Sequence, residues 1–317
     1  MNNNIKKSFK TSIGGQALIE GVMMKGPSKI AIAVRKPDND IELKVEKVND
    51  LSKKYKILDF PIIRGAYKLI DSMVVGINSL MYAASFWEDE EQEETSKDKE
   101  GILNKIFKDK SESVEMAIII LFSFAIAALL FMILPSIVAG FLTKYTDSSL
   151  ILNLVEGLLR LSVFGIYLYY VSKVDDIRRV FEYHGSEHKS IHCYEAGDEL
   201  TVENVRKYPM VHPRCGTSFL FMVMIISILV LSFFGWPSPI MRMLSRIVAL
   251  PFIAGIAYEV NRIIGKSDLK ICKIMTIPGL KIQEYVTVRE PDDSMIEVAL
   301  ESLKAVLPED GESDLWA

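Results

Sequence analysis

The chain has 317 residues, of which 50% are hydrophobic and 25% charged, and its formal net charge is −4. A mean hydropathy of +0.22 is high for a soluble protein with that many charges, so the charged and the apolar residues must occupy different stretches. Three cysteines are too few for a disulfide scaffold, and the near-neutral charge argues against nucleic acid as the main partner. These values indicate a membrane protein.

The first region, residues 1–65, predicts a small β-structure. Ile30–Val34 and Ile41–Val45 are rich in β-forming residues, and the second run alternates apolar with charged side chains. Pro37–Asp40 between them has the residue types of a turn, so we expect a β-hairpin.

A glycine-rich segment, Gly14–Pro27, precedes this hairpin. One interpretation is a tight turn with a short strand. The other is a loop that brings Gln16 and Glu20 to a functional site. The segment lacks the glycine spacing of phosphate-binding loops, so no nucleotide site is expected.

Residues 66–87 predict a helix that is too short to cross a membrane. Ser72–Trp87 is uncharged over 16 residues. As a helix this stretch is about 24 Å long, against ~30 Å of hydrocarbon in a bilayer. We therefore expect an interfacial or re-entrant helix. A flexible linker, residues 88–113, is expected next, because eight of the thirteen residues of Glu88–Glu100 are acidic.

Four apolar stretches predict membrane-spanning helices in two hairpins, at residues 114–172 and 215–264. The expected spans are Met116–Thr143, Ser148–Ser172, Cys215–Met241 and Ile240–Ile263. Two of them contain uncharged runs of 28 and 27 residues, longer than the about 20 that a span requires. Glu156 and Arg160 interrupt the second stretch. Since residues four apart on a helix are neighbours, we favour a structural ion pair over a functional one.

The distribution of Lys and Arg predicts the orientation. The loop between the hairpins, residues 173–214, carries seven basic residues, and the first 68 residues carry 14. The positive-inside rule therefore places both termini and the central loop on the cytoplasmic side of the cell membrane. The predicted fold is a multi-pass α-helical membrane protein with a small cytoplasmic α+β domain. The N-terminus, the central loop and residues 265–317 would assemble this domain, and Ser294–Glu297 fits a capping box for a C-terminal helix.

The central loop carries the candidate chemistry, because all four histidines lie there within 29 residues. His184–His188 reads H-x-x-E-H. In this arrangement two histidines at i, i+4 bind zinc, and the adjacent glutamate, here Glu187, handles the proton of a bound water. Glu187 is therefore the candidate general base.

A catalytic zinc needs a third protein ligand, and four residues are candidates for it: His192, Glu195, His212 and Cys215. A helix rises about 12 Å between His184 and His192, so these two cannot share one ion. A ligand from the turn His212–Cys215 is easier to place. The predicted metal set is therefore His184, His188, His212 and Cys215, with His192 and Glu195 as alternatives. Without a metal, the imidazoles would form a structural network with neighbouring carboxylates.

Four motifs together resemble the bacterial YqhQ family of multi-pass membrane proteins of unknown function: Gly14–Pro27, Glu182–Lys189, His212–Ser218 and Arg289–Asp293. The resemblance covers nearly the whole chain, from Ile13 to Val306. It implies a metal-dependent enzyme, a label that the family carries without an established substrate.

Two hypotheses follow. In the first, the protein is a zinc-dependent hydrolase at the cytoplasmic membrane face, acting on a lipid head group or on a peptide bond near the bilayer. In the second, it is a non-catalytic assembly or scaffold factor that binds a membrane or cytoplasmic protein, and its His/Cys cluster is structural. Transport is less favoured, since four spans with one internal ion pair offer little pathway.

Overall fold

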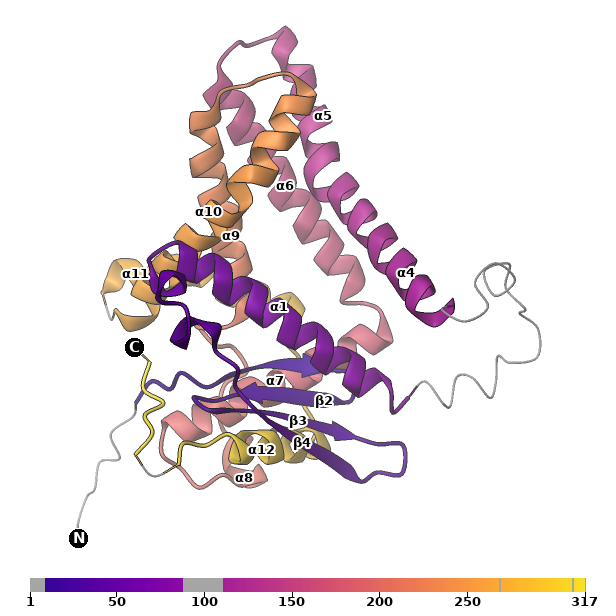
Figure 1. Cartoon of the computed structure of the whole chain (residues 1–317), viewed down its shortest axis with the longest axis vertical. Coiled ribbons are helices and arrows are strands. Elements are labelled where there is room, and N and C mark those ends of the chain that lie inside the picture. The colour runs from indigo at the N-terminus through magenta and orange to yellow at the C-terminus, as the bar shows by residue number, and fades with distance from the viewer. Residues whose placement is uncertain (1–8, 88–110, 268, 310, 317) are drawn as a thin grey trace. The chain divides into compact units, whose positions relative to one another are not determined.

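The computed structural model describes residues 9–87, 111–267, 269–309 and 311–316, and the chain divides into two compact units (Figure 1). Unit 1 comprises Met1–Trp87, Leu168–Val223 and Pro251–Ala317, and unit 2 comprises Glu88–Tyr167 and Met224–Leu250. The acidic stretch Glu88–Glu100 of the predicted linker lies outside the described residues.

Unit 1 contains a four-stranded antiparallel sheet with its strands in chain order. The strands are β1 (Gly14–Leu18), β2 (Gly21–Lys25), β3 (Lys29–Arg35) and β4 (Ile41–Lys47). β3 and β4 form the hairpin that the sequence predicts, with Arg35 paired to Ile41. The glycine-rich segment forms a second hairpin, β1–β2, whose two-residue turn holds Glu20 at a φ of 47°.

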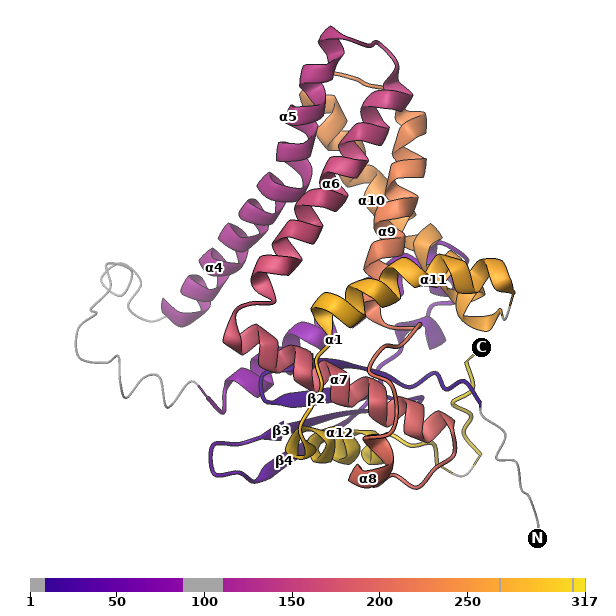
Figure 2. The ribbon, with the colours of Figure 1, turned by 180° about the vertical axis from the view of Figure 1, so that it is seen from behind.

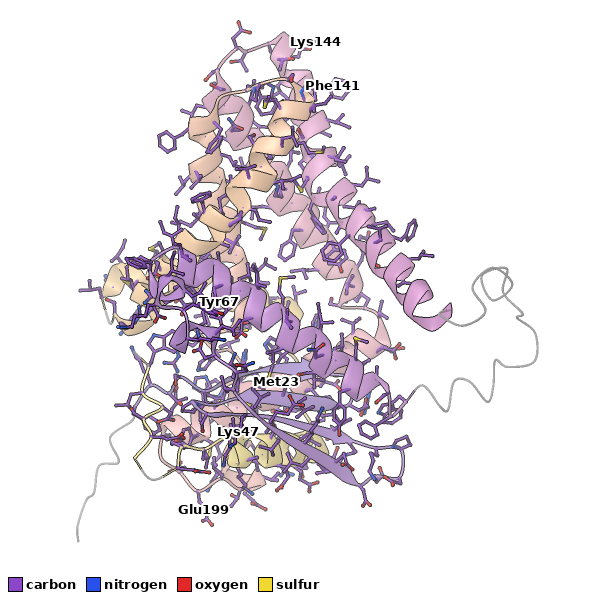
Figure 3. All side chains as sticks on the ribbon, viewed as in Figure 1. Met23, Lys47, Tyr67, Phe141, Lys144 and Glu199 are labelled. Carbon is purple, nitrogen blue, oxygen red and sulfur yellow. The ribbon has the colours of Figure 1, made fainter. Side chains whose placement is uncertain are left out.

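Helices cover both faces of this sheet (Figures 1 and 2). Helix α1 (Ile63–Ala84) lies on one face, and α7 (Asp175–Glu195) and α12 (Asp293–Ala305) lie on the other. Successive side chains of a strand point to opposite faces. Met23 of β2 therefore packs in the core beneath α1, while its two neighbours pack in the core with α7 and α12 (Figure 3). Because both of its faces are buried, β2 lacks an alternating pattern.

Unit 1 contains five further described elements. They are η1 (Leu51–Lys53), η2 (Lys56–Asp59), α8 (Val202–Val205), α11 (Lys270–Ile282) and η6 (Gln283–Thr287). The long apolar segments are α4 (Ser111–Ala128), η3 (Leu129–Ile133), α5 (Leu134–Gly140), η4 (Phe141–Lys144), α6 (Ser149–Val171), α9 (Gly216–Leu231), η5 (Ser232–Phe234) and α10 (Pro239–Lys266).

Four of the described helices are long and apolar enough to cross a membrane, as the sequence predicts. They are Leu121–Lys144, Ser149–Val171, Gly216–Phe234 and Pro239–Lys266. The chain is therefore a multi-pass membrane protein, and lipid contacts these helices. Phe141 and Lys144 mark the connection between the first two of them (Figure 3). The side of the membrane on which each loop lies stays a prediction.

Helix α1 corresponds to the expected interfacial helix and is not one of the four candidate spans among the described residues. Its residues Gly76 and Ala83 are buried, whereas Ile70, Val74 and Ile77 are exposed. An apolar exposed face on a helix is what an interfacial position requires. That position itself stays a prediction.

The N-cap of α12 lies two residues before Ser294, the N-cap of the predicted capping box. Its N-cap is Asp292, whose carboxylate accepts a hydrogen bond from the Met295 N–H at 3.0 Å. Ser294 instead donates to Asp292 Oδ1 at 2.6 Å. The capping-box assignment was wrong because Asp caps a helix as well as Ser does and lies further upstream. Helix α12 has an apolar face turned to the core, since Ile296 and Leu303 are fully buried.

Candidate metal centre

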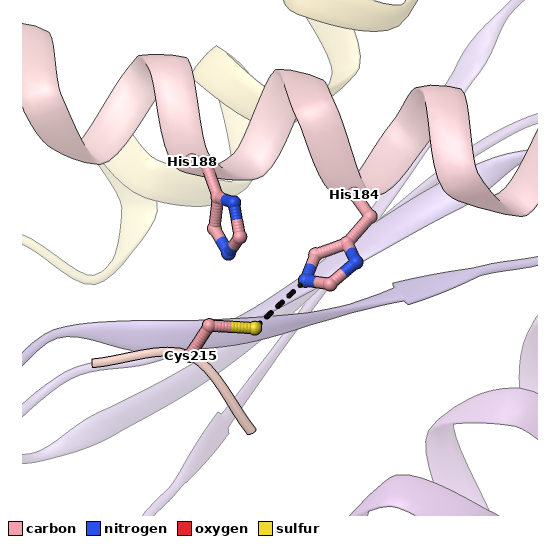
Figure 4. A group of neighbouring side chains, drawn as sticks. All are labelled: His184, His188 and Cys215. Carbon is pink, nitrogen blue, oxygen red and sulfur yellow. Dashed lines mark hydrogen bonds between the residues drawn. The ribbon is translucent and has the colours of Figure 1, made fainter. Parts of the chain in front are cut away.

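Helix α7 and the start of α9 bring together three side chains that could hold a metal ion. His184 and His188 lie on α7 one turn apart, so both rings point to the same side (Figure 4). Cys215 immediately precedes α9 and faces them. His184 Nε2 lies 3.1 Å from Cys215 Sγ, and one donor atom of each residue lies within 4.8 Å of the other two.

Hydrogen bonds to backbone carbonyls fix the tautomer of both histidines. His184 Nδ1 lies 2.9 Å from the Thr287 carbonyl oxygen, and His188 Nδ1 lies 2.5 Å from that of Met210. A carbonyl only accepts, so each Nδ1 carries the proton and each Nε2 presents a lone pair. The lone pair of His184 Nε2 faces Cys215 Sγ. Second bonds of this kind orient metal-binding histidines in proteins. The Nε2 atom of His188 is buried and has no hydrogen-bond partner.

Cys215 sits where a thiolate is favoured. Burial by itself would raise the pKa of the Cys215 thiol, but the neighbouring His188 and the N–H of Thr217, 3.4 Å from Sγ, bring it below its ordinary value. The positive end of the α9 dipole acts in the same direction. Burial lowers the pKa of His188 to about 4, so its imidazole is neutral at neutral pH. Neutral imidazole and thiolate are the forms that bind metal.

Glu187 lies beside this cluster on the same helix and is buried. Its Oε1 accepts the N–H of Gly15 at 2.9 Å, and its Oε2 lies 3.9 Å from His184 Nε2. Burial raises the pKa of Glu187 to about 7, with His184 acting in the opposite direction. A carboxyl group with a pKa near 7 can both accept and release a proton under physiological conditions.

Two glycines make this packing sterically feasible. A Cβ at Gly185 would lie 2.1 Å from the carbonyl oxygen of Arg289, because the segment before α12 passes directly over α7 there. A Cβ at Gly15 would lie 2.4 Å from the Met23 carbonyl and 3.1 Å from Glu187 Cγ. Close backbone approach therefore explains a glycine inside α7, where it lowers helix propensity by about 1 kcal/mol relative to alanine.

A second group on the next turns of α7 consists of His192, Glu195 and His212. Glu195 already accepts from Arg214 and from the Thr11 N–H at 2.7 Å. Arg214 Nη2 also lies 3.3 Å from His212 Nε2. A guanidinium at this position repels a metal cation, so we interpret this group as an ion-pair and hydrogen-bond network.

The predicted ligand set is thus divided between the two groups. His184, His188 and Cys215 meet, while His212 lies with His192 and Glu195. Gln283 fixes the His212 backbone, accepting from its N–H at 2.8 Å and donating to its carbonyl at 2.9 Å. Neither Gln283 nor the carbonyl partners of the histidines can be recognised in the sequence, because contacts between distant segments leave no local pattern.

The glycine-rich segment contributes its backbone to the site rather than Gln16 or Glu20. The Gln16 side chain packs against Gly76 of α1, on the opposite face of the sheet from α7. Glu20 forms an ion pair with Arg179 and accepts from the Tyr183 hydroxyl at 3.2 Å. The contact with the candidate site comes from the N–H of Gly15.

Comparison with known proteins gives a family without a known activity. The family described as "Protein of unknown function (DUF1385)" matches residues 60–309. A relative named "Uncharacterized protein YqhQ", from Bacillus subtilis (strain 168), is 31% identical over 312 residues, which cover 95% of this chain and 94% of that protein. No solved structure matches.

Proposed function

This chain belongs to the DUF1385 family, and we propose that it is a zinc-dependent hydrolase acting next to the membrane surface. His184, His188 and Cys215 would hold the metal, and Glu187 would serve as the general base. The observation that carries the proposal is the buried Nε2 atom of His188, which has no hydrogen-bond partner. Such an atom costs about 1–3 kcal/mol, and a metal ion bound between the three donors would remove that cost.

The donor set fits zinc. Two imidazole nitrogens and a thiolate are ligands that zinc prefers over the oxygen-binding cations. Three protein ligands leave a fourth position open, which is the pattern of catalytic rather than structural zinc. Zinc bound in such a site supplies a Lewis acid for hydrolysis.

Glu187 supplies the group that moves a proton. Its Oε1 is fixed by the Gly15 N–H, which leaves Oε2 on the side of His184. A carboxylate held this way accepts a proton from water and passes it to the leaving group. A pKa of about 7, raised by burial, suits both transfers.

The position of Cys215 in the chain supports a substrate at the membrane. Cys215 precedes Gly216, the first residue of a candidate span, so the site would lie where that helix enters the bilayer. The substrate would be an ester or amide in a lipid head group, or a peptide bond close to the bilayer surface.

Non-catalytic assembly remains the second candidate function. It is favoured by the way the site joins separate segments: α7, the stretch before α9, and η6 all contribute contacts to the two histidines. A metal could serve here to hold these segments together. The two candidates differ in whether Glu187 has a chemical role.

Elemental analysis of the detergent-purified full chain tests the metal centre. We expect about one zinc per chain, as in other single-ion sites, and loss of the metal in His184→Ala/His188→Ala. His192→Ala is the matched control, since His192 lies on the same helix in the second group and should leave the zinc in place. A well-folded wild type that takes up no zinc after reconstitution would show the hydrolase proposal to be wrong.

A further inference from the structure

Four charged side chains lie together inside unit 2, on segments that form candidate membrane spans. Glu156 and Arg160 are on α6, and Arg242 and Arg246 are on α10. All four are buried or nearly so, with Glu156 only 2% exposed. The sequence indicates the first pair. Arg246 of α10 joins it through a hydrogen bond to Glu156, and Arg242 lies one turn before Arg246 on the same helix.

Hydrogen bonds and ion pairs within this cluster engage only some of its charged groups. Glu156 Oε1 accepts from Arg160 Nη2 at 2.9 Å, and its Oε2 accepts from Arg246. Arg160 Nε donates to the Phe131 carbonyl at 2.9 Å. That carbonyl lacks its usual helical donor because the residue four positions on is Pro135, which has no N–H.

The two arginines of α10 keep unpaired donors. The Nε atoms of Arg242 and Arg246 are buried and have no hydrogen-bond partner. The guanidinium of Arg242 stacks on the Trp236 ring, with its carbon 3.9 Å from the ring centroid. Stacking leaves the edge of a guanidinium, which carries its N–H groups, available to a ligand.

The charges do not balance. Three arginines, which stay protonated in proteins, surround one carboxylate, so within the described residues two positive charges have no acidic side chain. An uncompensated charge in a membrane-spanning segment is unfavourable, and such residues mark functional sites by default. The imbalance therefore points to an anion from outside the chain.

The depth of the arginines suits a phosphate group. Along α10, Arg242 lies about 5 Å and Arg246 about 11 Å from Pro239, the end that follows the short connection from α9. These are depths from which arginine side chains reach the polar interface of a bilayer.

We propose that Arg242 and Arg246 form a binding site for a phosphate group, with Glu156 fixing the orientation of Arg246. The planar fork of the Arg242 guanidinium matches phosphate oxygens in a bidentate arrangement. The Nε of Arg246 adds a further donor, since its Nη2 already donates to Glu156 and its Nη1 to Ser136 at 3.3 Å. The phosphate comes either from the head group of an anionic phospholipid or from free phosphate, which share this chemistry. The site is independent of the candidate metal centre.

Fluorescence of Trp236 tests the proposal on the full chain. The sequence has three tryptophans, so Trp87→Phe/Trp316→Phe leaves Trp236 as the only reporter. The protein is placed in nanodiscs of phosphatidylcholine and titrated with inorganic phosphate, at constant chloride. In a second arm phosphatidylglycerol replaces an increasing fraction of the lipid. We expect a saturable change in Trp236 fluorescence in one of the two titrations. The titration that responds identifies the source of the phosphate.

Variants distinguish a specific phosphate-binding site from non-specific electrostatic attraction of anions. Arg242→Gln and Arg246→Gln should each shift the half-saturation point at least tenfold. Lys266→Gln removes the same charge from an exposed position at the other end of α10 and should leave it unchanged. The proposal is overturned if Trp236 fluorescence does not change in either titration. It is also overturned if Lys266→Gln shifts the half-saturation point as much as the arginine variants do. If the arginine variants fail to fold, the wild-type titrations alone decide.

Discussion

Two carboxyl groups on α7, the buried Glu187 and the partly buried Glu195, have pKa values shifted in opposite directions. Glu195 meets Arg214 and His212, and these contacts hold its pKa below the ordinary value although burial acts to raise it. Glu187 has no cationic side chain among its hydrogen-bond partners, so burial dominates and raises its pKa to about 7. Their environments, rather than their spacing in the motif, make Glu187 the candidate base.

Replacing Glu187 by glutamine tests that assignment. The amide keeps the size of the side chain and its contact with the Gly15 N–H, but it cannot accept a proton. We expect the zinc content to stay unchanged and hydrolysis of lipid vesicles or of a membrane-anchored peptide to fall by roughly 10²–10⁴-fold. Product is measured by mass spectrometry, with Glu195→Gln as the matched control. Loss of zinc in Glu187→Gln would instead make Glu187 a ligand.

Gly185→Ala tests the close approach of the Arg289 carbonyl to α7. Alanine is the better helix former by about 1 kcal/mol. Its Cβ, however, would stand 2.1 Å from a backbone oxygen, so we expect a net destabilisation of about 1–3 kcal/mol. Thermal unfolding measures the difference. Gly165→Ala on α6 is the control, because a Cβ there meets nothing within 4 Å and should not destabilise.

At the level of elements, composition predicts the spans better than it predicts the ends of helices. Uncharged runs of 27 and 28 residues admit few alternatives, and all four expected spans correspond to described helices. The end of a helix depends on which of several adjacent polar side chains accepts a hydrogen bond from a free backbone N–H of the first turn. Asp292 and Ser294 both qualify, and only the structure distinguishes them.

Asp292→Ala tests the cap of α12. Loss of the bond to the Met295 N–H should destabilise unit 1 by about 0.5–2 kcal/mol. Ser294→Ala, at the position that the sequence favoured, should cost less. Hydrogen bonds from Ser294 and Met295 outweigh partial burial and hold the pKa of Asp292 below its ordinary value. The cap therefore contributes fully at neutral pH, and its contribution disappears as the pH falls through that pKa. Chemical unfolding at pH 7 and pH 3 measures both effects.

The candidate site was predictable only in part for a related reason. Helical periodicity places His184, His188 and His192 on one face, but it does not say which turn of α7 meets Cys215 and which meets His212. The path of the chain from Met210 to Cys215 decides this, and Gln283 fixes that path through the His212 backbone. A contact 71 residues away in the chain has no signature in a single sequence.

At the scale of the whole molecule, the small domain is built from three distant parts of the chain. The sheet, α7 and α12 share one core, as the sequence predicts for a domain assembled from the N-terminus, the central loop and the C-terminus. Where the β1–β2 hairpin forms, the sequence leaves open a tight turn with one short strand or a loop, and it does not predict two paired strands. Glycines obscured β1, and burial of both faces removed the alternation from β2.

Metal removal should therefore affect the stability of the assembled domain. If zinc joins α7 to the start of α9, a chelator should lower the midpoint of thermal unfolding by roughly 5–10 °C, the order expected from tight ligand binding in a chain of this size. Added zinc should restore the midpoint. The His184→Ala/His188→Ala variant should not respond to the chelator, and a response equal to that of wild type would place the metal elsewhere.

The hydrogen bond from Gly15 to Glu187 has a consequence for how this protein tolerates mutation. Its donor is a backbone amide, so no change of side chain deletes it except proline, which has no N–H. In a saturation-mutagenesis screen, position 15 should therefore respond to the volume of the replacing residue and hardly to its polarity. Positions 184, 188 and 215 should respond to chemical identity. The screen would thus report a polar contact of the candidate base as a steric constraint.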